Sequence, residues 1–243
     1  MIIAVCLNPA LDITHHVPVV DWAGVNRPTA VFARPGGKGV NVARTLRALG
    51  ADVMLMGLAG GATGSWLETS LGGLDIATAF IPVGGESRRT FTVVDGRGAT
   101  ALFSEPGPEV SLAEFATFRG RLRAALDGAA AVVLSGSLPP GLPPDAYATL
   151  IETAGDAGVP ALLDTHGEAL RRGVEAGAAL VKPNLDELQA LTGRRLTALQ
   201  GIDWAAVSAA ARQLRRAGAG AVVVSLGADG LFAITPEIGR AHV

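Results

Sequence analysis

Short apolar runs alternate with helical patterns along most of this chain, and that alternation restricts the fold more than any other feature. The apolar runs lie at residues 2–7, 51–58, 130–134, 160–163, 179–181 and 221–226. The helical patterns lie at residues 42–49, 65–71, 111–127, 145–157, 168–173 and 204–218. Continuous apolar runs are typical of strands buried on both faces of a parallel sheet that is covered by helices. The sequence therefore predicts an α/β fold with a doubly wound, mostly parallel sheet.

Polar side chains recur just after these apolar runs. They are Asp12, Ser137, Asp164, Asn184 and Ser225. In an open α/β sheet the carboxyl ends of the strands converge on one crevice, which is where ligands bind. We therefore expect these side chains to belong to a binding site, although each of them taken alone is equally compatible with an ordinary turn.

Residues 34–44 read RPGGKGVNVAR, so three glycines flank a lysine directly before a helical pattern. Glycines at such a place let the backbone approach a ligand closely. The N-terminus of the following helix presents free N–H groups and a partial positive charge, which suits a phosphate or a polar sugar. A glycine-rich turn that merely starts a helix would look the same, so the loop alone does not decide the function.

Residues 76–102 change to a two-residue period, and Thr90 to Leu102 predicts an antiparallel hairpin around Asp95-Gly96. Such strands inside a βα alternation suggest a small separate sheet that acts as a lid. We expect lid strands within about residues 13–33 and 76–103. Residues 1–236 are expected to form a single domain.

Composition excludes several classes of protein. The net charge is −2 with no long basic run, so we expect no nucleic-acid partner. Cys6 is the only cysteine, which excludes a disulfide framework and favours the cytoplasm. No apolar run reaches the roughly 18 residues of a membrane span, and we expect residues 1–5 to start the first strand rather than a signal peptide. We also expect Cys6 and Trp22 to be packing residues, and His15 and His16 to be solvated or turn residues.

Five motifs occur in one order over nearly the whole chain, and together they resemble a known family. They are NPALD at 8–12, GGKGVNVAR at 36–44, SGSLPPG at 135–141, KPNLDEL at 182–188 and SLGADG at 225–230. The chain is similar to sugar kinases of the ribokinase superfamily. Within it, the chain resembles the branch of 1-phosphofructokinases, tagatose-6-phosphate kinases and the minor type of 6-phosphofructokinase.

The resemblance implies a substrate side to the site. Asp12 would accept hydrogen bonds from sugar hydroxyls, which suits a carboxylate because it offers only acceptors. Arg88 and Ser137 would hold the phosphate already on the sugar, and Arg27 would join them. The residues expected to bind the substrate are Asp12, Arg27, Gly36, Gly37, Lys38, Asn41, Arg88 and Ser137.

The resemblance also implies a nucleotide side, with ATP and Mg²⁺ as cofactors. Lys182, Asn184 and Glu187 would face the nucleotide phosphates. Glu187 would act through magnesium-bound water, with Asp164 helping to place the ion. Ser225, Gly227 and Gly230 would line the ATP side.

The expected reaction is ATP-dependent phosphorylation of a ketohexose phosphate, with fructose 1-phosphate converted to fructose 1,6-bisphosphate. The alternatives are a 6-phosphofructokinase or a tagatose-6-phosphate kinase and, in another class, a catalytically inactive sugar-binding or regulatory protein of the same fold. Arg88 and the 135–141 motif argue against an unphosphorylated substrate. The family also implies a homodimer that forms through the lid sheet.

One family motif is missing from the sequence. The expected Gly-Ala-Gly-Asp, whose aspartate is the general base, is not found after residue 234, so no catalytic residue is assigned. Residues 237–243 read EIGRAHV, the translation of a common sequencing-adapter string, and we expect them to be a non-native tail. From this we expect a C-terminally truncated kinase domain that is poorly soluble and shows no kinase turnover.

Overall fold

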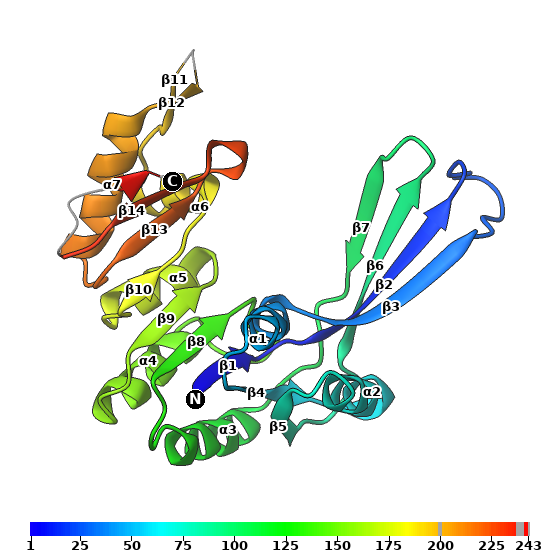
Figure 1. The fold of residues 1–243 in the computed structure, drawn as a ribbon, viewed down its shortest axis with the longest axis horizontal. Helices are drawn as coiled ribbons and strands as arrows, with labels where there is room; N and C mark the ends of the chain where they lie inside the picture. Colours follow the sequence, from blue (N-terminus) through cyan, green and yellow to red (C-terminus); the bar gives the residue numbers. More distant parts are fainter. Residues whose placement is uncertain (199–200, 237–240, 243) are drawn as a thin grey trace. The chain divides into compact units, whose positions relative to one another are not determined.

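The chain has a mixed α/β fold with a large, mostly parallel sheet and a small second sheet, as the alternation predicts (Figure 1). The structure is a computed structural model and describes residues 1–198, 201–236 and 241–242. The chain divides into two compact units. The first unit comprises residues 1–3, 119–138 and 143–243, and the second comprises residues 4–118 and 139–142. Within the described residues, no helix combines the length and apolar character needed to cross a bilayer.

The second unit is built around one end of the large sheet. Its elements there are β1 (Ile2–Cys6, shared at its start with the first unit), α1 (Lys38–Ala48), β4 (Val53–Ala59), α2 (Gly61–Gly72) and β5 (Ala77–Pro82). Strands β4 and β5 are parallel neighbours. Helix α1 places Val40 and Ala43 on one face, and both are fully buried against Ala4, Cys6 and Leu55. Burial of Cys6 confirms it as a small core side chain.

The small sheet of the second unit has four strands, in the order β3-β2-β6-β7, and we call it the lid sheet. Its strands are β2 (Ala10–Val17), β3 (Ala30–Gly36), β6 (Arg88–Asp95) and β7 (Thr100–Ser104). Strands β6 and β7 form the predicted antiparallel hairpin, β2 and β3 are also antiparallel, and β2 and β6 run parallel. In Figure 1 the four strands extend together beyond α1 and α2.

Two expectations about this region need correction. Asp12 does not lie in a turn after the first strand, because β2 begins at Ala10 and Asp12 is inside the lid sheet. The expected lid region began at residue 76, but the first strand after that residue, β5, belongs to the large sheet, where it pairs parallel with β4. A half-buried strand has the same alternation in either sheet, so the pattern alone cannot assign it.

The first unit carries the strand order β15-β14-β13-β10-β9-β8. Its strands are β8 (Ala131–Ser135), β9 (Ala161–Asp164), β10 (Leu180–Val181), β13 (Val222–Ser225), β14 (Leu231–Ile234) and β15 (Ala241–His242). Strands β8, β9, β10 and β13 are parallel, whereas β14 and β15 are antiparallel additions. A separate two-stranded hairpin joins β11 (Thr197–Ala198) and β12 (Gly201–Ile202). Of the expected non-native tail, residues 237–240 and 243 lie outside the described residues.

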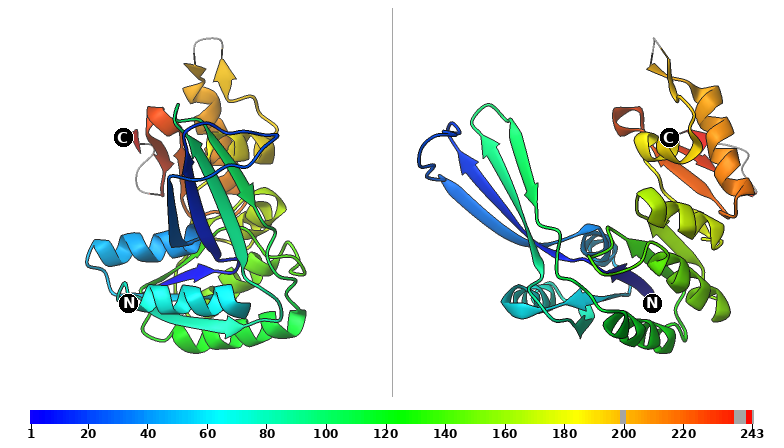
Figure 2. Two further views of the ribbon diagram at one scale, coloured as in Figure 1. Left: turned by 90° about the vertical axis from the view of Figure 1, so that its right-hand side faces the viewer. Right: turned by 180° about the vertical axis from the view of Figure 1, so that it is seen from behind.

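Helices α4 (Ala146–Asp156), α5 (Gly167–Glu175), α6 (Leu185–Thr192) and α7 (Trp204–Arg216) contact one another in series in the first unit (Figure 2). Helix α3 (Leu112–Ala125) crosses the boundary between the two units. Helix α6 begins with Asn184 as its N-cap, in a reciprocal capping box with Glu187. That box is the local reason why the helix begins at Leu185.

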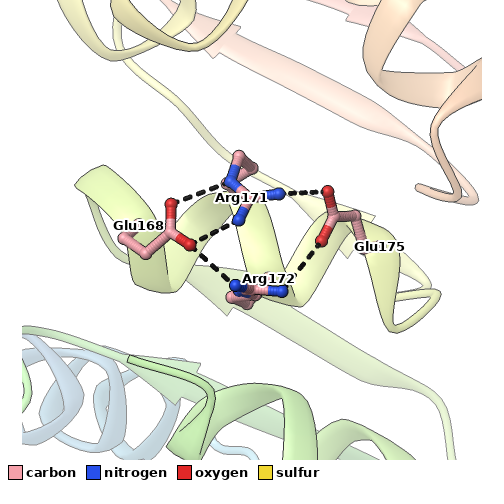
Figure 3. Close-up of polar contacts among 4 residues, drawn as sticks. All are labelled: Glu168, Arg171, Arg172 and Glu175. Atoms are coloured by element: carbon pink, nitrogen blue, oxygen red, sulfur yellow. Dashed lines mark hydrogen bonds and ion pairs between the residues drawn. The ribbon is translucent and has the colours of Figure 1, made fainter. Parts of the chain in front are cut away.

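Helix α5 carries a compact group of charges on its exposed surface (Figure 3). Arg171 bonds the carboxylates of both Glu168 and Glu175. The Nε of Arg172 donates to the Glu168 carboxylate at 2.9 Å, and a terminal nitrogen of Arg172 lies 3.9 Å from a carboxylate oxygen of Glu175. The spacings of three and four residues place all four side chains on neighbouring turns of one helix.

Candidate active site

A hollow of about 640 Å³ lies in the second unit, over one face of the lid sheet. It is lined by Asp12, Thr14, His16, Phe32, Arg34, Pro35, Gly37, Lys38, Asn41, Arg44, Arg88, Thr90, Thr92, Leu102 and Ser104. Five of the residues expected to bind the substrate are among them: Asp12, Gly37, Lys38, Asn41 and Arg88. The lid sheet and the first turns of α1 therefore bring these five residues to one place.

The glycines before α1 are required by geometry close to Asp12. A Cβ on Gly36 would overlap the Asp12 carboxylate, so only glycine leaves room for that side chain. Gly37 has a φ of 97°, which disfavours other residues. Asn41 follows one turn into α1, and its backbone N–H donates to the carbonyl of Gly37 at 3.0 Å. The loop thus shapes one wall of the hollow around the carboxylate.

Asp12 is the one carboxylate among the residues that line this hollow. Burial raises the pKa of Asp12 above its usual range, because the charged form loses hydration. A hydrogen bond from the Thr90 hydroxyl and the positive charges of Arg88 and Arg44 oppose that rise in the pKa. The result is an acceptor that is only partly hydrated and is surrounded by cations, a suitable partner for sugar hydroxyls.

Arg88 is held in place by two contacts within the second unit. Its Nε donates to the carbonyl oxygen of Asn8 at 3.1 Å, and one terminal nitrogen donates to the hydroxyl of Ser104 at 2.7 Å. Asn8 in turn donates to the carbonyl oxygen of Pro106 at 2.9 Å. These bonds leave part of the guanidinium facing the hollow, where it can bind an anion.

Several residues of the hollow were not found by sequence reasoning. They are Thr14, His16, Phe32, Arg34, Arg44, Thr90, Thr92, Leu102 and Ser104. The signal was present, because residues at even spacing from Asp12 and Arg88 share their face of the sheet. What the sequence did not show was the pairing of β2 with both β3 and β6, which gathers four strands over one hollow.

The adjacent histidines, expected to be solvated or turn residues, lie in a strand rather than in a turn. Both are half-buried in β2 and point to opposite faces of the lid sheet. His16 lines the hollow with its ring 5.7 Å from that of Phe32, whereas His15 lies 6.5 Å from the ring of Phe91 on the other face. Trp22 was expected to pack in the core but is 80% exposed.

Three expected substrate residues, Gly36, Arg27 and Ser137, do not line the hollow, although Gly36 packs against the Asp12 carboxylate. Arg27 is exposed in the connection between β2 and β3. Ser137 follows β8 and belongs to the first unit, while Asp12 and Arg88 belong to the second. Their part in substrate binding stays a prediction.

The expected nucleotide residues gather at the ends of neighbouring strands in the first unit. Lys182 follows β10, and its Nζ lies 3.2 Å from the carboxylate of Asp164 at the end of β9. Asn184 forms a parallel β-bridge with Ser225, which ends β13. The backbone N–H of Ser225 donates to the carbonyl of Pro183 at 3.0 Å, so the two segments are held together.

A short 3-10 turn, Gly227–Asp229, follows β13 and completes this edge of the first unit. Gly227 and Gly230 have φ values of 63° and 82°, which explains the glycines on either side of the turn. The N–H of Leu226 donates to the carbonyl of Gly230 at 2.9 Å and closes the loop. The turn is thus an exposed, glycine-bounded loop at the end of β13.

The acidic groups of the first unit are compatible with a magnesium ion that is held mainly by its ligand. Among the described residues, no three His, Cys, Asp or Glu side chains gather closely enough to hold an ion by themselves. Mg²⁺ bound with a nucleotide needs only one or two carboxylates, since phosphates and water supply the other oxygens. Glu187 places a negative charge at the start of α6, where it would repel phosphates unless a cation lay between them. The part of Asp164 and Glu187 in holding such an ion stays a prediction.

Comparison with solved structures agrees with this architecture. Phosphofructokinase-2 from Escherichia coli, solved in complex with fructose-6-phosphate, has a TM-score of 0.91 and 34% identity over 100% of this chain and 78% of its own. A possible 1-phosphofructokinase from Thermotoga maritima has a TM-score of 0.83 and 27% identity over 97% of this chain and 75% of its own. A putative phosphofructokinase from Staphylococcus aureus has a TM-score of 0.80 and 29% identity over 97% and 74%.

The fold, with its large, mostly parallel sheet and its small second sheet, is that of the ribokinase-like sugar kinases. The model of the pfkB family of carbohydrate kinases matches residues 7–242. This chain belongs to the pfkB family.

Proposed function

We propose that this protein phosphorylates a ketohexose phosphate with ATP, and that its preferred substrate is fructose 1-phosphate, converted to fructose 1,6-bisphosphate. The observation that carries the proposal is one hollow that combines a partly buried carboxylate, Asp12, with an anchored arginine, Arg88. The carboxylate suits sugar hydroxyls and the guanidinium suits a phosphate. A sugar with both kinds of group matches the hollow better than a plain sugar does.

The choice of fructose 1-phosphate rests on resemblance rather than on geometry. Residues 24–27 read GVNR, a tetrad similar to that of 1-phosphofructokinases. Arg27 and Ser137 would join Arg88 at the phosphate. Fructose 6-phosphate and tagatose 6-phosphate are the alternative substrates, and the former is bound in the Escherichia coli relative.

On the nucleotide side we assign Lys182 to the phosphates of ATP, with Asn184 and Ser225 holding the strand ends around them. Gly227 and Gly230 would let the ATP approach the backbone. Phosphoryl transfer depends mostly on positioning and charge neutralisation. Bound Mg²⁺ would supply part of that neutralisation, with Asp164 and Glu187 as its nearest carboxylates.

The lid sheet also has a second, apolar face that supports the proposed homodimer. A hollow of about 500 Å³ on that face is lined mainly by apolar and aromatic side chains, among them Val17, Trp22, Phe91, Val93 and Phe103. Exposed apolar area of this kind marks an interaction surface. A second copy of the same sheet is the partner we propose. Escherichia coli phosphofructokinase-2 also has a tetrameric inhibited form.

The test is a set of calorimetric titrations of the purified protein, which measure binding directly and need no turnover. Fructose 1-phosphate is expected to bind more tightly than fructose 6-phosphate, tagatose 6-phosphate and fructose, and Mg-ATP is expected to bind as well. Arg88→Ala should remove the preference for phosphorylated sugars. The matched control is Arg97→Ala, at the exposed tip of the β6–β7 hairpin.

Each outcome of these titrations decides between the hypotheses. Equal affinity for fructose and its phosphates would refute a phosphosugar site. Sugar-phosphate binding without Mg-ATP binding would favour the second function, a sugar-binding or regulatory protein. Turnover measured with each sugar phosphate then ranks the candidate substrates.

A further inference from the structure

Gly136, the residue directly after β8, is held by three hydrogen bonds within the first unit. Its carbonyl oxygen accepts one bond from the hydroxyl of Tyr147 at 3.2 Å and another from the hydroxyl of Thr165 at 2.9 Å. Its N–H donates to the carbonyl of Asp164 at 2.9 Å. A carbonyl oxygen has two lone pairs, so both acceptor positions of Gly136 are used.

The two hydroxyl donors are buried and come from separate elements. Tyr147, the only tyrosine of the chain, lies on α4 and is 0% exposed. Thr165 follows β9 and is 1% exposed. Gly136 itself is buried and has a φ of 114°, a conformation that residues with a Cβ rarely adopt. Two buried side chains thus hold one turn of unusual backbone geometry.

The peptide that follows Gly136 carries this anchoring to Ser137. The C=O of Gly136 and the N–H of Ser137 belong to one planar peptide unit, which is trans. The two bonds of a trans unit point in opposite directions, so an oxygen held toward Tyr147 and Thr165 directs the Ser137 N–H away from them. Residues 134–136 are buried, whereas Ser137 is partly exposed. The chain after β8 therefore first reaches solvent at Ser137.

We propose that Tyr147 and Thr165 are positioning residues, which fix the peptide after Gly136 so that Ser137 faces the phosphate of the sugar substrate. This inference rests on the proposed function, which assigns Ser137 to that phosphate. Hydrogen bonds weaken as they depart from linearity, so the direction of a donor matters. A loop that is fixed before the ligand arrives also loses less conformational entropy on binding. The two hydroxyls thereby raise the affinity without touching the substrate.

The competing explanation is that the two hydroxyls only satisfy buried polar groups of the core. Loss of a buried hydrogen bond lowers the free energy of unfolding in either case, so stability does not separate the two explanations. A purely structural role predicts an unchanged affinity of the folded protein for sugar phosphates. Thr153 provides a matched control, because it is 4% exposed on α4 and its hydroxyl donates to the carbonyl of Thr149 in the same helix at 2.7 Å.

The experiment measures the dissociation constants of fructose 1-phosphate, fructose 6-phosphate and Mg-ATP by calorimetry on the full chain, with each variant first shown to be folded. Tyr147→Phe and Thr165→Val each remove one donor and keep the shape of the side chain. Each should weaken the better sugar phosphate about threefold, and the double variant about tenfold or more, because the Gly136 carbonyl then has neither hydroxyl. Thr165→Ser should restore the affinity, and Thr153→Val should change none.

Two further readings separate positioning from a general disturbance. Tyr147→Phe should leave the affinity for Mg-ATP unchanged. Ser137→Ala should weaken the sugar phosphates by itself, and adding Tyr147→Phe to it should cause a smaller further loss than the same change causes in the wild type, because residues that act through one another are not additive.

Three results would overturn the inference. The first is a double variant that binds the sugar phosphates as tightly as Thr153→Val does; if the double variant does not fold, the same comparison is made with the two single variants. The second is an equal loss of affinity for sugar phosphates and Mg-ATP in Tyr147→Phe. The third is a loss in Tyr147→Phe that is undiminished when Ser137 is already alanine. Failure of the wild type to bind either sugar phosphate overturns the proposed function instead, so the two failures are distinguishable.

Discussion

At the scale of single residues, the proposed binding of substrate depends on the ionisation of Asp12. Burial raises the pKa of this carboxyl group, so the folded protein binds its proton more tightly than the unfolded chain does. Asp12 therefore favours folding below its ordinary pKa, and this contribution is lost as the pH rises through the raised pKa. The proposed sugar binding has the opposite dependence on pH, because sugar hydroxyls donate to the ionised carboxylate.

The first prediction concerns the pH dependence of sugar binding. Sugar-phosphate affinity should fall as the pH is lowered through the raised pKa of Asp12, and the fall should begin above the pH at which an ordinary aspartate titrates. Asp12→Asn should weaken binding about tenfold or more, the effect of a lost charged hydrogen bond, and should abolish this pH dependence. Titrations at several pH values check both expectations. An unchanged pH profile in Asp12→Asn would show that another group controls binding.

The second prediction concerns Ser104, which positions Arg88 through a 2.7 Å hydrogen bond. Ser104→Ala removes the acceptor of a charge-assisted bond, a loss of about 1.5 kcal/mol that corresponds to roughly tenfold weaker binding of phosphorylated sugars. Affinity for unphosphorylated fructose should not change, which separates positioning of Arg88 from a general loss of structure. Ser65→Ala, exposed on α2, is the control. Equal losses for fructose and its phosphates would contradict the positioning role.

At the scale of elements, the charged group on α5 shows how little an exposed ion-pair network contributes. The Arg171 guanidinium beside Glu168 lowers the pKa of that carboxyl group to about 2. A lowered carboxyl pKa stabilises the fold above the ordinary value of 4.5, and that contribution is lost as the pH falls toward 2. The side chains are exposed, so solvent and salt weaken the attraction.

The third prediction is therefore a small effect with a defined dependence on conditions. Glu168→Gln should lower the melting temperature slightly at pH 7 and low salt. The difference from wild type should shrink in 1 M salt and disappear as the pH approaches 2. Thermal melts in both salts and over that pH range provide the measurement. A large loss of stability that persists in 1 M salt would mean that Glu168 contributes through packing rather than charge.

At the scale of the whole molecule, the two faces of the lid sheet differ, since one carries the polar hollow around Asp12 and the other the apolar hollow that we propose as a dimer interface. The fourth prediction is that the protein sediments as a dimer and that Phe103→Asp yields monomers, since a buried charge in an apolar interface is costly. Phe103 is 53% exposed in the isolated chain, so the substitution should not disturb the folded monomer. Leu49→Asp, at an apolar residue that is 78% exposed at the end of α1, should remain dimeric. A monomeric wild-type protein would refute the proposed interface.

Sequence reasoning succeeded where one local pattern sufficed. The alternation predicted the α/β fold, and the Asp95-Gly96 turn predicted the β6–β7 hairpin. It failed where a residue's role depends on which strands become neighbours. His16 and Arg34 carried no distinguishing local signal, and they became part of the hollow only because β2 pairs with both β3 and β6.

The sequence by itself determined the class of fold, the family and the glycine loop, because periodicity, turn residues and motifs are local properties of a chain. Only the tertiary structure decided which face each lid residue occupies, which arginines share the hollow with Asp12, and which contacts anchor Arg88. The physical reason is that strand pairing is long-range. The neighbours of a side chain in a sheet come from strands that lie dozens of residues away in the sequence, as β6 does from β2.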